Sequence, residues 1–191
     1  LIIDDQICNI SKANNINFYR GSENNLIKRY LNCAKKYNVS NIIRITSDCP
    51  LVNPTSIKKM YNYFINKKID YYSNTCPPDL SKYPDGSDIE IFSFKALDKL
   101  NNLKQNKVEK EHVYGFWKNK KIFKTKILKK NKDISKFKYS LDYKSDLILL
   151  QKLVKKLKKK NVIGSSETIT NLIMRDKKLL KISNQNQSFY L

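Results

Sequence analysis

The sequence predicts an α/β domain with a largely parallel sheet, because helix-like and strand-like segments alternate along it. From residue 23 to residue 38, apolar side chains recur at steps of three and four residues, which is typical of a helix with one buried face. Residues 41 to 46 form a short run rich in β-branched residues, as expected of a strand buried on both faces. A chain of 191 residues is long enough for one sizeable core, so we expect a single domain over residues 1 to 191.

The first half of the chain alternates regularly between the two patterns. The expected segments are a helix ending near residue 14, a strand at 17 to 20, a helix at 23 to 38, a strand at 41 to 46, a helix from 54 and a strand at 69 to 73. Pro54 fits the first helical position behind Asn53 as N-cap. Residues 75 to 86 contain three prolines and end in Gly86, so we expect a loop, and loops of this length are often functional.

The second half continues the alternation. The expected segments are a strand at 87 to 94, helices at 95 to 104 and 107 to 118, strands at 122 to 128 and 137 to 141, and helices at 146 to 159 and 165 to 175. In the first strand, Ile89 and Ile91 fall on one face and Glu90 and Phe92 on the other. The last helix is indicated by Ser165, which is placed to cap its beginning.

The net charge of +21 would ordinarily favour nucleic acid or an anionic membrane as partner. Lysine, asparagine and isoleucine are over-used together along the whole chain, however, which indicates a drift in composition and not a basic patch. Four of the 38 basic residues are arginine, the residue best suited to reading bases. We therefore expect no nucleic-acid partner.

The cysteines are spaced neither as C-x-x-C pairs nor as a zinc site, so we expect free thiols. They are Cys8, Cys33, Cys49 and Cys76. No apolar run approaches the roughly 20 residues that cross a bilayer, and no secretory signal opens the chain. We expect no membrane partner and a cytoplasmic location.

Two aspartates follow predicted strands. Asp48 comes after the strand at 41 to 46, and Asp142 after the strand at 137 to 141. In open α/β sheets ligands bind beyond the carboxyl ends of strands, and magnesium takes one or two carboxylates with water and substrate phosphates as further ligands. The pair therefore predicts a Mg²⁺ site, although both aspartates also suit ordinary turn or N-cap positions.

Several motifs occur in a fixed order. They are R-G-S-E from residue 20, I-R-I-T-S-D-C-P-L at 43 to 51, D-Y-Y-S-N at 70 to 74, Y-P-D-G-S-D-I-E at 83 to 90, E-H-V at 111 to 113 and S-L-D-Y-K-S-D-L at 140 to 147. Each is weak alone. Together, from about residue 2 to residue 185, they resemble the spore-coat polysaccharide branch of the acylneuraminate cytidylyltransferase family.

The resemblance implies a fold, a reaction and a metal. The fold would be three-layered and Rossmann-like, of the nucleotide-diphosphosugar-transferase (GT-A-like) type, with a mixed, mostly parallel sheet. The reaction would transfer CMP from CTP to the hydroxyl of a sugar, acidic or amino, and release pyrophosphate for surface polysaccharide synthesis. The resemblance assigns the Mg²⁺ ion to Asp48 and Asp142, which raises the expectation for Asp48 most, and it is compatible with a homodimer.

Further candidate site residues lie in the same motifs, each with a structural alternative. Arg44 would contact the nucleotide or phosphate as a catalytic residue, or else pair with a structural carboxylate. The acidic turn would bind sugar hydroxyls, or else form a polar hairpin. The residues of this turn are Asp85, Gly86, Asp88 and Glu90.

Two more sets complete the candidates. His112 is the only histidine, and with Glu111 it would serve as a base or sugar ligand, or be simply packed or solvated. Arg20, Gly21 and Ser22 would form a substrate loop, or Ser22 would be an N-cap.

One departure from the family pattern is marked. Family members begin with a strand and a phosphate-cradling loop rich in Arg, Ser, Gly, Pro and Lys, which has no counterpart here, and such loops hold phosphates through backbone amides. We therefore expect the chain to be incomplete at its N-terminus and to bind CTP poorly. This departure leaves open the alternative that the protein is a non-catalytic binding remnant of the family. A glycosyltransferase of similar fold is a further alternative, but its usual D-x-D motif is matched only loosely, by Asp85 and Asp88.

Overall fold

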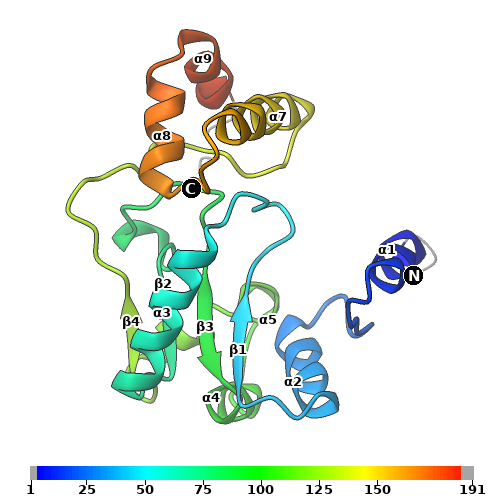
Figure 1. Ribbon diagram of the computed structural model, residues 1–191. Helices are drawn as coiled ribbons and strands as arrows, with labels where there is room; N and C mark the ends of the chain where they lie inside the picture. Colours follow the sequence, from blue (N-terminus) through cyan, green and yellow to red (C-terminus); the bar gives the residue numbers. More distant parts are fainter. Residues whose placement is uncertain (1–3, 186–191) are drawn as a thin grey trace.

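The computed structural model describes residues 4 to 185, without the side chains of Glu111, His112 and Gln185. The described part is a mixed α/β fold around a four-stranded sheet, with a group of helices at one end of it (Figure 1). The strands are β1 (Asn41–Arg44), β2 (Tyr71–Ser73), β3 (Glu90–Ser93) and β4 (Thr125–Ile127). The helices are α1 (Asp5–Ala13), α2 (Leu26–Lys36), α3 (Pro54–Lys67), α4 (Phe94–Asn101), α5 (Lys107–His112), α6 (Gly115–Lys118), α7 (Lys144–Lys159), α8 (Ser166–Met174) and α9 (Lys177–Gln185), with a 3₁₀ turn η2 (Pro78–Leu80).

The strand order is β1-β3-β2-β4, and antiparallel pairs predominate in the described sheet. β3 is antiparallel to both β1 and β2, and only β2 and β4 are parallel. The sheet is mixed, as expected, but the prediction of a largely parallel sheet is wrong. The reason is the connection between β2 and β3, which contains only the turn η2 and no crossover helix of the kind that parallel neighbours need.

Helices cover both faces of the sheet. Phe92 of β3 packs with side chains of α2 and α4 on one face, whereas Ile91 packs with side chains of α3 on the other. Neither Phe92 nor Ile91 is exposed to solvent, which confirms the alternation predicted for this strand. Local signals also set the helix ends: Asn53 accepts a hydrogen bond from the Ser56 N–H at 3.0 Å and caps α3 as predicted.

Two predicted strands are absent from the described sheet. Residues 17 to 20 run from α1 towards α2 without strand pairing, and the Phe18 carbonyl accepts instead from the Tyr37 hydroxyl. Residues 137 to 141 make one isolated parallel bridge, between Lys138 and Asp85. Both segments have the composition of a strand, but a strand forms only beside a partner, and their neighbours here are loops and helices.

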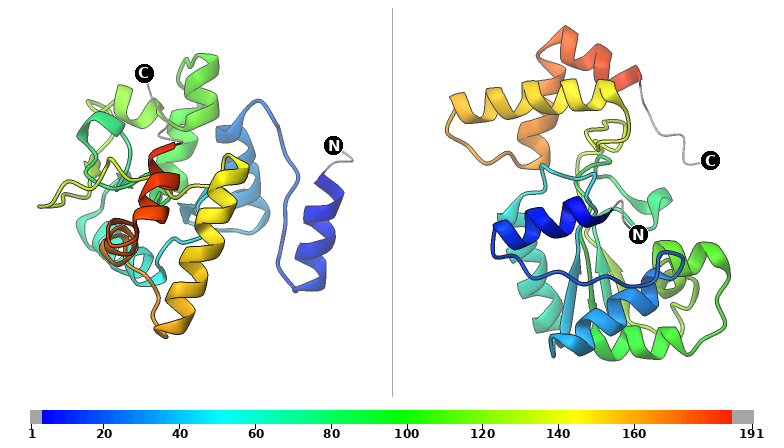
Figure 2. Two further views of the ribbon diagram at one scale, coloured as in Figure 1. Left: turned by 90° about the horizontal axis from the view of Figure 1, so that it is seen from above. Right: turned by 90° about the vertical axis from the view of Figure 1, so that its right-hand side faces the viewer.

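Two helix predictions are also corrected. The helix predicted at 107 to 118 is divided at Val113, which has a φ of 54° and separates α5 from α6. Helix α9 was not predicted. Its apolar side chains, such as Leu179, pack against α7 and α8 in a separate core cluster, and these three helices lie beyond the carboxyl end of β1 (Figures 1 and 2).

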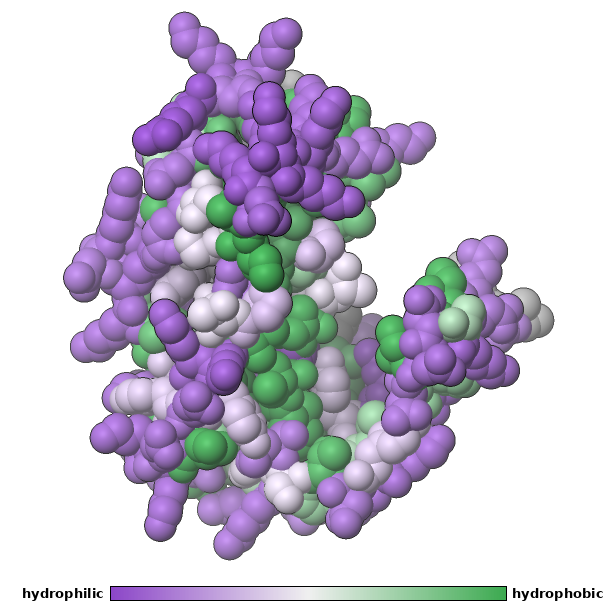
Figure 3. Space-filling model, viewed as in Figure 1, coloured by the Kyte–Doolittle hydropathy of each residue, from purple (hydrophilic) through white to green (hydrophobic). Residues whose placement is uncertain are grey.

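Helix α1 stands apart from the rest of the described chain in Figure 1 and in the view from above (Figure 2, left). The space-filling view shows it as an arm separated from the body by a hollow (Figure 3). Ile7 and Ile10 on this helix are each 64% exposed. Among the described helices, none is long and apolar enough to cross a membrane.

Candidate functional site

Three loops meet between the sheet and the helices α7 to α9. They are residues 45 to 53 after β1, residues 82 to 89 before β3, and residues 138 to 143 before α7. Backbone hydrogen bonds tie the third loop to the other two: the Leu141 N–H donates to the Asp48 carbonyl at 2.8 Å, and the Tyr139 N–H donates to the Asp85 carbonyl at 2.9 Å. The structure thus brings together acidic residues that are up to about a hundred positions apart in sequence.

Asp48 and Asp88 lie on two sides of one thiol. The Cys49 Sγ is 3.5 Å from the Asp48 Oδ1 and 3.4 Å from the Asp88 Oδ2, and the Thr46 hydroxyl is 3.1 Å away. Burial first, and then the negative charge of Asp88, raise the pKa of the Cys49 thiol. The sulfur therefore stays protonated and is a weak donor to these carboxylates.

Gly86 allows the acidic turn to approach the third loop. Its φ is 100°, and a Cβ on it would lie 2.5 Å from the Ser140 nitrogen and 2.6 Å from the Tyr139 carbonyl carbon. The Gly86 N–H donates to the Asp88 Oδ2 at 2.9 Å. This position therefore requires glycine because of backbone conformation and close contact, irrespective of any sugar.

Asp142 is held by its own loop. The Ser140 hydroxyl lies 2.9 Å from the Asp85 Oδ2 and 3.1 Å from the Asp142 Oδ2, and it donates to one of them at a time. The Lys138 Nζ is 2.8 Å from the Asp142 Oδ2. The Asp142 side chain is 42% exposed, so the carboxylate is partly accessible from solvent.

Lys138 and Asp146 were not among the site residues predicted from the sequence. They form a buried ion pair with an Nζ to Oδ2 distance of 2.7 Å. Asp146 lies within the motif at 140 to 147. The signal for Lys138 was a lysine on the apolar segment 137 to 141, which is unusual at a buried position unless the charge is paired.

Arg44 lies in the structural ion pair that the sequence left as its alternative role. Its Nη1 contacts the Glu90 Oε1 across the β1–β3 pair, and the Tyr71 hydroxyl donates to the Glu90 Oε2 at 2.8 Å. Burial raises the pKa of the Glu90 carboxyl, and Arg44 opposes that shift. The Arg44 Nε is buried without a hydrogen-bond partner among the described residues.

The remaining predicted site residues lie away from the three loops, or their side chains lie outside the described residues. Arg20 pairs with Asp5 at 2.5 Å and with Asp4 at 3.9 Å, at the beginning of α1. Gly21 and Ser22 are exposed in the loop before α2, and Asn25 is the residue that caps this helix. The backbones of Glu111 and His112 belong to α5, but their side chains lie outside the described residues.

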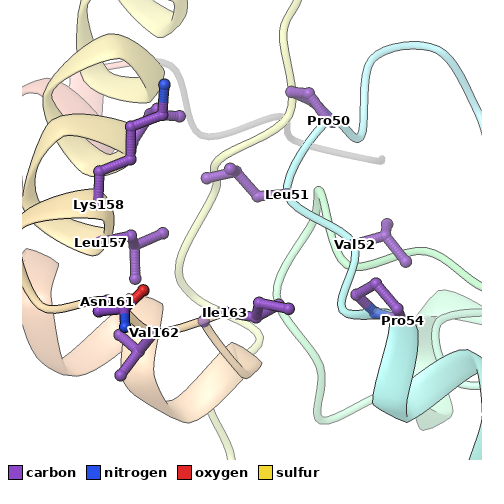
Figure 4. Close-up of a pocket in the computed structure, with 11 residues that line it drawn as sticks. Pro50, Leu51, Val52, Pro54, Leu157, Lys158, Asn161, Val162 and Ile163 are labelled. Carbon is purple, nitrogen blue, oxygen red and sulfur yellow. The ribbon is translucent and has the colours of Figure 1, made fainter.

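A pocket of about 420 Å³ lies beside the Asp48 loop. Pro50, Leu51, Val52 and Pro54 form one wall and face Leu157, Lys158 and the segment from Asn161 to Ile163 on the other (Figure 4). The walls are mainly apolar. The pocket therefore differs in chemistry from the carboxylate cluster on the three loops, which consists of Asp48, Asp85, Asp88 and Asp142.

The carboxylate cluster suits a hard cation with few protein ligands. Among the residues described, no group of three or more His, Cys, Asp and Glu side chains is arranged to hold a metal ion. Magnesium is commonly bound through one or two carboxylates, with water and substrate phosphates completing its coordination. The donor chemistry of Asp48 and Asp142 is compatible with that mode.

The chain is similar to known proteins over most of its length. A family model described as "Cytidylyltransferase" matches residues 3 to 169. An uncharacterized protein, MJ1063, of Methanocaldococcus jannaschii is 31% identical over 122 residues, which are 63% of this chain and 48% of that protein. The chain thus spans about half the length of this relative.

A solved structure is similar over nearly the whole chain. The structure of a cytidylyltransferase from Leptospira borgpetersenii serovar Hardjo-bovis superposes with a TM-score of 0.80 and 33% sequence identity. The match covers 99% of this chain and 77% of that one.

Proposed function

Because the chain belongs to the cytidylyltransferase family, we propose that it transfers CMP from CTP to a sugar hydroxyl with release of pyrophosphate. The family supports nucleotidyl transfer in general. The sugar, which we infer to be acidic or amino, and the use of the product in surface polysaccharide follow from the motif resemblance. A D-x-D motif is absent at Ser47-Asp48-Cys49-Pro50, and the family match also favours this reaction over glycosyl transfer.

One observation carries the proposal: two aspartates predicted to act together lie on adjoining loops. The hydrogen bond from the Leu141 N–H to the Asp48 carbonyl places the residue before Asp142 directly against Asp48. Asp85 and Asp88 approach the same place from the acidic turn, through Ser140 and Cys49. The three loops that meet here therefore carry four aspartates.

Asp48 and Asp142 are the residues that would hold Mg²⁺. When bound, the ion would neutralise negative charge that develops on the α-phosphate. The protein's own contribution is mainly positioning and electrostatics, as in other phosphoryl-type transfers. The hydrogen bond from the Leu141 N–H to the Asp48 carbonyl joins the two aspartate-bearing loops, which supports the proposal that both carboxylates bind the same ligand.

The acidic turn is suited to the sugar. Carboxylate oxygens of Asp85 and Asp88 accept hydrogen bonds from hydroxyl groups, whereas Gly86 has a structural role in holding this turn against the third loop. In the transfer, the sugar oxygen bonds to the α-phosphorus as the bond to pyrophosphate breaks. His112 stays the residue proposed to accept the hydroxyl proton, on the sequence alone.

The test is pyrophosphate release from CTP with Mg²⁺ and a panel of acidic and amino sugars, with CTP raised to concentrations that offset the weak CTP binding expected from the sequence. Asp48→Asn should reduce turnover by more than about 100-fold, because even outer-shell changes at metal sites cost about 10- to 100-fold. Asp79→Asn, an exposed aspartate of η2, is the matched control and should leave turnover unchanged.

Two results would contradict the proposal. Unchanged turnover in Asp48→Asn would remove this residue from the mechanism. Nucleotide or sugar binding without any turnover would support the non-catalytic alternative instead.

A further inference from the structure

We propose that Lys138 and Asp146 are positioning residues, which as a buried ion pair hold the Asp142 carboxylate and its backbone in place for cation binding. The inference rests on the proposed function, because it takes Asp142 as a cation ligand. Neither residue of the pair would touch the cation or the substrate. Their effect would pass through Asp142.

The pair is almost completely removed from solvent. The side chains of Lys138 and Asp146 are each 3% exposed. Buried charges persist when they are paired and when their remaining hydrogen-bonding capacity is satisfied. Here the Lys138 ammonium contacts two carboxylates, at 2.7 Å in Asp146 and 2.8 Å in Asp142.

Asp146 fixes the backbone at Asp142. Its Oδ2 accepts hydrogen bonds from the Asp142 N–H and the Tyr143 N–H, each at 3.0 Å. These contacts join the first turn of α7 to the loop before it. The same oxygen accepts a hydrogen bond from the Lys138 Nζ. One buried oxygen atom therefore links the backbone of Asp142 to the lysine ammonium that contacts the Asp142 side chain.

The loop needs such an anchor because the sheet does not supply one. Residues 137 to 141 form no strand and make a single bridge, from Lys138 to Asp85. Asp142 follows this segment with a side chain that is 42% exposed. Without the Lys138 contact, the Asp142 carboxylate would retain the Ser140 hydroxyl at 3.1 Å, which it shares with Asp85.

The direction in which cation affinity changes when Lys138 is removed distinguishes a positioning role from electrostatic repulsion of the cation. An ammonium beside a carboxylate repels an incoming cation, so its removal would by charge alone tighten cation binding. If Lys138 acts by positioning, its removal weakens binding, and partners of metal ligands typically contribute about 10- to 100-fold in affinity.

The experiment measures Mn²⁺ binding to the whole chain by electron paramagnetic resonance of the free ion. Lys138→Met combined with Asp146→Asn removes both charges together, so that neither is left buried and unpaired. We expect its Kd for Mn²⁺ to rise about 10- to 100-fold, with circular dichroism showing an unchanged fold at the temperature of the titration. Lys138→Arg keeps the charge and should bind closer to wild type than the double variant.

The matched control is an exposed ion pair on the same helical layer. Lys156 and Asp176 are 3.1 Å apart, with side chains 43% and 30% exposed. Lys156→Met with Asp176→Asn removes the same charges from the surface and should leave the Kd unchanged.

Asp142→Asn distinguishes failure of the inference from failure of the proposed function. If Asp142→Asn weakens Mn²⁺ binding but the Lys138 and Asp146 double variant binds as tightly as wild type, or more tightly, the positioning role is overturned. If Asp142→Asn has no effect either, the cation site of the proposed function is overturned together with it.

Discussion

Gly86→Ala tests how closely the acidic turn must approach the third loop. The substitution adds one methyl group at a residue whose φ is 100°. That methyl would lie 2.5 Å from the Ser140 nitrogen and 2.6 Å from the Tyr139 carbonyl carbon. Both are backbone atoms, so no side-chain rotation relieves the contact.

The expected cost has two parts. A left-handed backbone conformation costs a non-glycine residue about 1 to 2 kcal/mol. Forcing an extra methyl into a packed site typically costs about 1 to 3 kcal/mol. The free energy of unfolding should therefore fall by about 2 to 5 kcal/mol, which is a large part of the roughly 5 to 15 kcal/mol that stabilises a typical domain.

The assay is urea unfolding, followed by the fluorescence of Trp117, the only tryptophan. Gly164→Ala is the matched control, since its added methyl would meet side-chain atoms of Ile169 at 2.9 Å and Leu157 at 3.0 Å and no backbone atom at that distance. We expect the control to lose roughly 1 kcal/mol. A loss in Gly86→Ala no larger than that of the control would refute the reasoning.

Three further predictions follow from buried or paired ionisable groups. Partial burial raises the pKa of the Cys76 thiol from 9.0 to about 12, so at about pH 8 its thiolate fraction is lower by roughly three orders of magnitude. Iodoacetamide should label Cys76 slowly in the native protein and readily in urea, and rapid native labelling would contradict the raised pKa. The hydrogen bond from Lys118 lowers the pKa of the Glu109 carboxyl, so its contribution to stability is present above the unfolded pKa of about 4.3 and is lost as the pH falls through the folded value. The melting temperature of Glu109→Gln should accordingly lie below that of wild type near pH 7 and converge with it near pH 3, whereas a difference independent of pH would refute this account. Arg44→Met leaves the buried Glu90 carboxylate without its cation and should lower the free energy of unfolding by about 3 to 5 kcal/mol; adding Glu90→Gln should recover at least half of that in urea unfolding, and no recovery would show that Arg44 acts independently of Glu90.

The helices were the most predictable part of the fold because their signals are local. The periodicity of Leu26, Ile27, Tyr30 and Leu31 and the cap at Asn53 depend on residues within a turn or two, and both helices formed where predicted. Helix α9 was not predicted because its stability comes mainly from packing against α7 and α8, and less from any local signal in its own sequence.

The candidate site was predictable in its residues but not in its connections. The order of the motifs identified Asp48 and Asp142 as a pair, and the structure places their loops in contact. The motif also contained Asp146, but nothing local indicated that Lys138 would lie against it. For Arg44 the sequence left two roles open, and the position of Glu90 on the adjacent strand was needed to show the ion pair.

By itself, the sequence determined the α/β class, the positions of most helices, and the ordered motifs that indicate a cytidylyltransferase. Only the tertiary structure decided that β3 runs against both neighbours, that residues 17 to 20 and 137 to 141 pair with no strand, and that Lys138 joins Asp142 to Asp146. The physical reason is the distance along the chain over which each interaction acts. Helical periodicity and capping are properties of neighbouring residues, whereas strand pairing and the burial of charge depend on partners that folding brings in from distant parts of the chain.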